Sequence, residues 1–145
     1  MPGQIIPQIV AAVLAISLAG VALIHFYWAI GGRRGLELAI PMEQDGTPVF
    51  SPGSGATLLI GMGLAISTLV ALERGFLWPG WIPPIYLDTG CWILAAVYSA
   101  RVLGDFRYFG LFRRIKGSPF ARWDAMLYTP FCAGLAGGFF LLLVW

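Results

Sequence analysis

The stretch YSARVLGDFRYFGLFRRIKGSPFARWDAMLY, residues 98–128, decides how this chain is organised. It holds most of the basic residues and two carboxylates, and it lies between two long apolar segments. Its basic residues are Arg101, Arg107, Arg113, Arg114, Lys116 and Arg122. A polar stretch in this position both orients a protein in a membrane and supplies groups for a functional site.

Composition predicts an integral membrane protein of one domain. The 145 residues are 59% hydrophobic and 11% charged, whereas soluble domains average roughly 45–50% apolar and about 25% charged residues. The basic residues gather in loops and at helix ends, a pattern typical of membrane topology rather than of nucleic-acid binding. We therefore expect the lipid bilayer, and no nucleic acid, as a partner.

Four segments have the length and apolarity to span a bilayer, which takes about 20 residues for a core of roughly 30 Å. Because lipid leaves no backbone group without a partner and no segment alternates like a barrel strand, the segments predict an all-α four-helix bundle. The predicted spans are residues 6–31, 55–77, 84–103 and 125–145, and the predicted cytoplasmic loops are residues 32–54 and 104–124.

The distribution of Lys and Arg predicts the orientation. Arg33 and Arg34 lie in the first loop and the basic cluster lies in the third, whereas the second loop offers only Arg74. The positive-inside rule then places both termini on the non-cytoplasmic side of a multi-pass protein of the cell membrane. At the outer level, Asp88 is expected to pair with a charge from the neighbouring helix.

The first loop is the only stretch of soluble character. Asp45-Gly46 is a turn signal between two short apolar runs, which predicts a small hairpin. Gly31-Gly32 predicts the end of the first helix, since glycine is the usual residue after a helix C-terminus.

Polar side chains converge on the cytoplasmic ends of three helices. In the first, Trp28 follows His25 by one turn; in the third, Tyr98, Arg101 and Asp105 share a stripe. At the start of the fourth, Asp124 and Tyr128 are one turn apart. Ionisable groups at this depth are costly unless they are paired or face water, which makes them site candidates.

These residues support two readings. In the first, His25 is an acid/base group, Asp124 or Asp105 is its orienting carboxylate, and Arg101 binds an anionic group. Trp28, Tyr98 and Tyr128 then line the pocket. In the second, Arg101 ties two helices together through Asp105 or Asp124, and His25 bonds a backbone carbonyl or a carboxylate.

The sequence does not name a reaction, so whether the protein is an enzyme stays open. One histidine and two separated cysteines cannot form a four-ligand zinc site, and we predict no metal site. Any cofactor is unknown, although a haem with His25 as its single protein ligand is compatible with the sequence.

The chain contains HFYWAIGGRRGLELAIP, followed by VFSPG and then by RVLGDFRYFGLFRRIKGSPFARWDAMLYTPFC. With these stretches, nearly the whole chain resembles a bacterial family of small four-helix inner-membrane proteins known only as a domain of unknown function. The resemblance is specific in three blocks: the end of the first helix, the end of the third and the start of the fourth. The family pattern matches His25, Trp28, Gly31, Gly32, Pro41, Arg101, Gly104, Asp105, Phe106, Gly110, Phe120, Asp124, Tyr128, Pro130 and Cys132. Thr129 and Phe131 depart from it, because the family usually has serine and leucine there. The resemblance implies the fold and this residue set, and no activity.

Two functions follow as hypotheses. One is a site at the cytoplasmic leaflet that binds or transforms a small amphipathic or lipid-soluble molecule. The other is an accessory subunit of a larger membrane complex, respiratory or photosynthetic, without chemistry of its own. The GxxxG pair Gly134 and Gly138 would then serve contacts with other subunits or with a second copy of the chain.

Overall fold

The computed structural model describes residues 5–43, 45–77 and 80–145 and is all-helical over these ranges. The elements are α1 (Ile5–Ala29), α2 (Leu36–Ala39), α3 (Ser54–Arg74), α4 (Pro84–Leu103), α5 (Pro119–Trp123), the π-helical turn η2 (Asp124–Tyr128) and α6 (Thr129–Leu143). The described residues form no strand, and only an isolated antiparallel bridge joins Met42 to Pro48. The all-α prediction is confirmed.

Within the described residues, three helices are long and apolar enough to cross a membrane: α1, α3 and the continuous helix Pro119–Leu143 formed by α5, η2 and α6. The remaining long helix, α4, has 20 residues. It carries Asp88 near one end and Arg101 near the other, and these charges lower its mean hydropathy. The helices therefore indicate a multi-pass membrane protein, while the fourth span and the orientation of the termini stay predictions.

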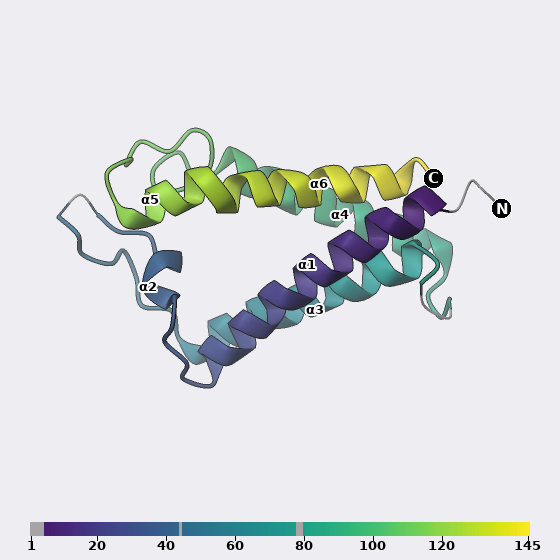
Figure 1. The fold of residues 1–145 in the computed structure, drawn as a ribbon, viewed down its shortest axis with the longest axis horizontal. Coiled ribbons are helices and arrows are strands. Elements are labelled where there is room, and N and C mark those ends of the chain that lie inside the picture. Colours follow the sequence, from purple (N-terminus) through teal and green to yellow (C-terminus); the bar gives the residue numbers. More distant parts are fainter. Residues whose placement is uncertain (1–4, 44, 78–79) are drawn as a thin grey trace.

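The four long helices form two antiparallel pairs, α1 with α3 and α4 with α6 (Figure 1). The beginning of α1 and the end of α6 lie at one end of the molecule, and the loops 30–53 and 104–118 lie at the other. The two pairs meet near the chain ends and diverge toward these loops, where α2 lies between them. We call the diverging half the loop end and the converging half the terminal end.

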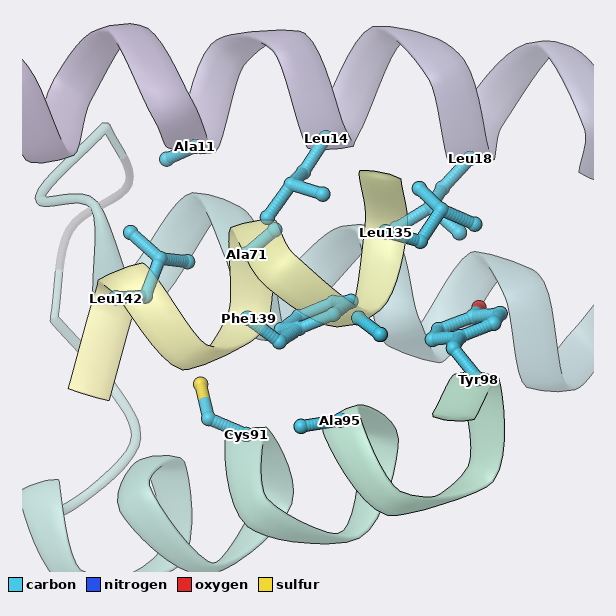
Figure 2. Packing of buried hydrophobic residues seen from close by; sticks show 11 residues of the cluster. Ala11, Leu14, Leu18, Ala71, Cys91, Ala95, Tyr98, Leu135, Phe139 and Leu142 are labelled. Carbon is cyan, nitrogen blue, oxygen red and sulfur yellow. The ribbon is translucent and has the colours of Figure 1, made fainter. Parts of the chain in front are cut away.

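The shared hydrophobic core fills only the terminal end. Figure 2 shows Leu14 and Leu18 of α1 directed toward Leu135 and Phe139 of α6, with Tyr98 of α4 on the other side. Among the described residues, none of α1 after position 18 and none of α3 before position 64 joins this core. The two helix pairs thus diverge beyond the point where their side chains stop sharing a core.

Two glycines let helices approach closely. A Cβ on Gly61 of α3 would lie 2.7 Å from the ring of Phe26 in α1, and one on Gly138 of α6 would lie 2.7 Å from Leu14. Gly134 has nothing within 4 Å of such an added atom. Of the GxxxG pair, therefore, only Gly138 serves packing inside the bundle.

The helix ends follow local sequence signals. Gly31, two residues after the end of α1, adopts φ +101°, as the predicted glycine C-cap requires. The last long helix begins at Pro119, earlier than the predicted residue 125. Ser118 explains this early start, because its hydroxyl accepts a hydrogen bond from the Ala121 backbone N–H at 3.1 Å, and proline is favoured at the first helical position.

The helix Pro119–Leu143 contains a π-helical turn, in which the Thr129 N–H donates to the Asp124 carbonyl five residues earlier. Pro130 follows this turn and has no N–H to donate to the carbonyl of Met126, four residues back. The wider turn accommodates the proline within a continuous helix. Such π-turns occur frequently at functional sites.

The first loop matches its prediction in part. A turn at Asp45-Gly46 brings the Glu43 N–H within 2.8 Å of the Thr47 carbonyl, close to the isolated bridge. The apolar run before it forms the short helix α2 rather than a strand. At the terminal end, the expected pairing of Asp88 is confirmed, since Arg74 Nε lies 3.0 Å from Asp88 Oδ1.

Candidate functional site

Asp124 is the centre of the polar cluster at the loop end. Its Oδ1 accepts from Arg101 Nη2 at 2.6 Å. Its Oδ2 accepts from the Gly110 N–H at 2.8 Å, from Thr129 Oγ1 at 3.0 Å and from Arg113 Nη1 at 3.4 Å. These five residues form what we call the Asp124 cluster.

The Asp124 cluster is closed around its carboxylate. Asp124 is 0% exposed, while the side chains of Arg101 and Arg113 are 28% and 14% exposed. A buried carboxylate is tolerated only when charged and polar partners surround it. The cluster thus fastens α4, the loop 104–118 and the π-turn to one another.

Two glycines shape the loop that reaches back to Asp124. Gly104 and Gly110 have φ +89° and +83°, and a Cβ on Gly104 would lie 1.9 Å from the Phe109 carbonyl oxygen. The Leu111 N–H donates to the Val102 carbonyl at 2.8 Å and thereby joins the end of the turn 104–110 to the last residues of α4. This tight return turns the Gly110 N–H toward Asp124.

Asp105 has a separate role inside this loop. Its Oδ1 accepts the backbone N–H groups of Arg107, Tyr108 and Phe109 at 3.0, 2.7 and 3.1 Å. Burial raises the pKa of Asp105, and these hydrogen bonds lower it by more, so the net pKa lies below the usual 3.8. Of the two partners expected for Arg101, the structure gives Asp124 rather than Asp105.

His25 and Trp28 lie together on α1. Their rings make an edge contact with 5.2 Å between centroids. His25 Nδ1 lies 2.9 Å from the Val21 carbonyl oxygen, which can only accept, so Nδ1 carries the proton. In the neutral ring, Nε2 is then the basic nitrogen. Trp28 Nε1 donates to the Arg34 carbonyl at 2.9 Å and fastens the start of the first loop.

The two candidate tyrosines have different surroundings. Tyr98 is buried in the core, where its ring stacks on Phe139 with 5.9 Å between centroids. The Tyr128 hydroxyl lies 3.3 Å from the Leu38 carbonyl and donates a hydrogen bond to it. Tyr128 therefore links the π-turn to α2.

A second contact holds the first loop against the basic segment. Glu43 accepts from Arg107 Nη2 at 3.1 Å and from the Tyr108 hydroxyl at 2.5 Å. The hydrogen bond from Tyr108 to Glu43 raises the pKa of the tyrosine. With the Tyr128–Leu38 bond, these contacts form what we call the loop latch.

An open pocket of about 780 Å³ adjoins the loop latch on the surface of the two loops. Its lining combines three carboxylates, two arginines and two apolar side chains: Glu43, Asp45, Asp105, Phe106, Arg107, Arg114 and Ile115. The described residues contain no group of three or more His, Cys, Asp or Glu side chains arranged to hold a metal ion.

The structure thus divides the predicted site residues into groups. Arg101 and Asp124 are in direct contact, and so are His25 and Trp28. Among the described residues, no hydrogen bond, ion pair or ring contact joins these two pairs, so a single pocket containing all of them stays a prediction. The sequence did not identify Glu43, Arg113 and Thr129 as residues of the polar contacts. Only Thr129 lies next to a readable signal, because Pro130 indicates a local irregularity in the helix.

The three apolar helices among the described residues indicate a multi-pass membrane protein of the all-helical class, and the Asp124 cluster lies where the loops meet the helices. Residues 18–139 match the family model described as a protein of unknown function (DUF3995), and the chain belongs to this family. Neither curated proteins nor solved structures gave a match to the chain.

Proposed function

We propose that the protein binds a small amphipathic or lipid-soluble molecule between its two helix pairs at the loop end. The observation that carries the proposal is the confinement of the shared core to the terminal end, while the loop latch bridges the diverging pairs. A helical bundle in a membrane that serves only as a scaffold gains stability from close van der Waals packing along its whole length. Here two helix pairs separate and a fastened loop lies across them.

The candidate residues take distinct roles in this proposal. His25 is the acid/base group of the proposed site, because the contact of Nδ1 with the Val21 carbonyl leaves Nε2 to accept a proton. Trp28 and Tyr128 each donate a hydrogen bond to a backbone carbonyl of the first loop, at Arg34 and Leu38. We assign Asp124 and Asp105 to positioning, since both carboxylate oxygens of Asp124 and the Oδ1 of Asp105 already accept hydrogen bonds from surrounding donors.

The orientation belongs to the proposal as well. Positive charge on both loops of the loop end supports a cytoplasmic location for residues 32–54 and 104–124. Both chain ends then lie on the outer side of a bacterial inner membrane. Labelling single cysteines with an impermeant reagent in intact cells tests this. A cysteine at Gly117 should be protected, and one at Trp145 should react.

Binding is tested on protein purified in a neutral detergent. Native mass spectrometry should detect a retained small molecule, or dodecyl alcohol, amine or phosphate should raise the thermal unfolding temperature. Trp28→Ala should weaken the binding about tenfold or more, whereas Trp145→Ala, a change to an exposed tryptophan away from the loop end, should not. Absence of any retained or added ligand would overturn the proposal.

A second function is favoured by a different surface. The outer side of α4 and α6 carries a shallow groove of about 310 Å³ lined by small and apolar residues, including Ser99, Ala133 and Gly137. Small residues let a helix from another membrane subunit approach closely. Gly137→Leu should then release a partner during gentle purification. Recovery of the wild-type protein alone from its native membrane would count against this function.

A further inference from the structure

The Asp124 cluster carries an unbalanced charge. Arg101 and Arg113 both contact Asp124, and no other carboxylate among the described residues pairs with either guanidinium. Two positive charges thus share one negative charge, in a site where α4 and the last helix meet the basic loop. Uncompensated charge is costly in such surroundings, because the local dielectric constant is low.

The cluster also has hydrogen-bond donors to spare. Arg101 Nη1 and Arg113 Nε are buried and have no hydrogen-bond partner among the described residues. A buried donor without an acceptor is destabilising, because it has lost its hydrogen bonds to water and gained none in the protein. Both donors belong to guanidinium groups, which match the oxygens of carboxylates and phosphates in shape and charge.

Apolar surface lies next to these donors in the chain. Leu127 follows Asp124 by three residues, about one turn of the helix, and is exposed. The Phe109 ring lies over the Arg101 guanidinium, with 4.4 Å between its centroid and Cζ. The surroundings therefore combine an excess positive charge with surface on which an alkyl chain can lie.

We propose that the Asp124 cluster binds the oxyanion head, a phosphate or a carboxylate, of an amphipathic molecule. The inference rests on the proposed function and specifies the chemical class of its ligand. The oxyanion supplies the missing negative charge and accepts from Arg101 Nη1 and Arg113 Nε. Both nitrogens are covered in this conformation, so binding displaces a neighbouring side chain, and the Phe109 ring is the contact that we expect to shift.

The test compares three probes on protein in neutral detergent: dodecyl phosphate, dodecanol and inorganic phosphate. Dodecyl phosphate should bind at least tenfold more tightly than dodecanol, as measured by thermal shift and native mass spectrometry. Arg113→Gln should remove this preference and leave dodecanol binding unchanged. Arg113 is the residue to change, because Asp124 keeps its pairing with Arg101 in that variant. Arg113→Lys should restore part of the preference.

The matched control is Lys116→Gln, which removes one exposed charge from the same segment. An equal loss in both variants would overturn the inference, since it would indicate general attraction to a basic surface. Equal binding of dodecanol and dodecyl phosphate would also overturn it and leave the proposed function standing. If neither dodecanol nor dodecyl phosphate bound, both this inference and the proposed function would be overturned. Equally tight binding of inorganic phosphate would confirm the oxyanion site and assign it to a soluble anion.

Discussion

Arg101 Nη2 and Asp124 Oδ1 lie 2.6 Å apart and join two helices that are separated in the chain by the basic loop. The pair is asymmetric, because Asp124 is fully buried and holds three further donors, whereas Arg101 is partly exposed. Removing Asp124 should therefore have a different effect on stability from removing Arg101.

Asp124→Asn should destabilise the protein more than Arg101→Gln. The first change leaves two guanidinium groups without their carboxylate, and breaking a buried pair costs about 3–5 kcal/mol. The second leaves Asp124 with Arg113, Gly110 and Thr129. Thermal unfolding in neutral detergent should rank wild type above Arg101→Gln and Arg101→Gln above Asp124→Asn. The reverse order of the two variants would show that Asp124 is not the centre of the cluster.

Gly104→Ala should prevent the loop from returning to Asp124. The new Cβ would collide with the Phe109 carbonyl, and the backbone there adopts a positive φ. We expect a large drop in unfolding temperature or loss of folded protein on size-exclusion chromatography. Gly117→Ala is the control, since an added Cβ there meets nothing within 4 Å. Equal unfolding temperatures of the two variants would contradict the close approach of Gly104 to the Phe109 carbonyl.

Thr129→Val should lower the free energy of unfolding by about 1 kcal/mol or more, because Asp124 loses a hydroxyl donor inside a closed site. Thr129→Ser keeps the hydroxyl and should stay close to wild type. Equilibrium unfolding in mixed micelles measures the difference. If the serine and valine variants lost equal stability, the hydroxyl would have no part in holding Asp124.

Asp105 should contribute stability that depends on pH. Its folded pKa lies below 3.8 because backbone N–H groups favour the charged form. The contribution is therefore present above about pH 4 and is lost as the pH falls through the folded pKa. The gap in unfolding temperature between wild type and Asp105→Asn should narrow below pH 4. A gap that stayed constant from pH 6 to pH 3 would contradict the role of the ionised carboxylate.

Glu43→Gln should loosen the loop latch and expose residues 40–49. The amide keeps the size of the side chain and loses the charge that pairs with Arg107. Hydrogen exchange of this segment should become faster while α3 and α6 remain unchanged. Glu37→Gln is a matched control on the same loop. Similar exchange in both variants would show that the Glu43 contacts do not hold the loop.

The membrane-type helices could be predicted because lipid requires long uninterrupted apolar segments, and α1, α3 and Pro119–Leu143 meet that requirement. The ion pair at Arg74 was predictable for a related reason: two adjacent helices with one short loop leave their terminal charges close together. For Arg101, the sequence left two possible partners, Asp105 and Asp124. Helical spacing alone did not decide between these two carboxylates.

The remainder of the Asp124 cluster depends on the path of a loop. Gly110 and Arg113 reach Asp124 only because the backbone turns back at Gly104, and no helical period describes such a turn. Glu43 and Arg107 are distant in sequence and meet through the placement of two loops. Pro130 was a readable signal, since a proline within an apolar helix indicates a local irregularity.

The π-turn at 124–128 has a consequence for how this family can change length. A π-turn holds one residue more than an α-turn while covering about the same rotation, so the helix segments before and after it stay in phase. Deleting a single residue there would keep Asp124 and Phe139 on their present faces of the helix. It would, however, force the ring of Pro130 against the carbonyl four residues before it. The extra residue and the proline are therefore coupled, and members of the family that lack one should lack the other.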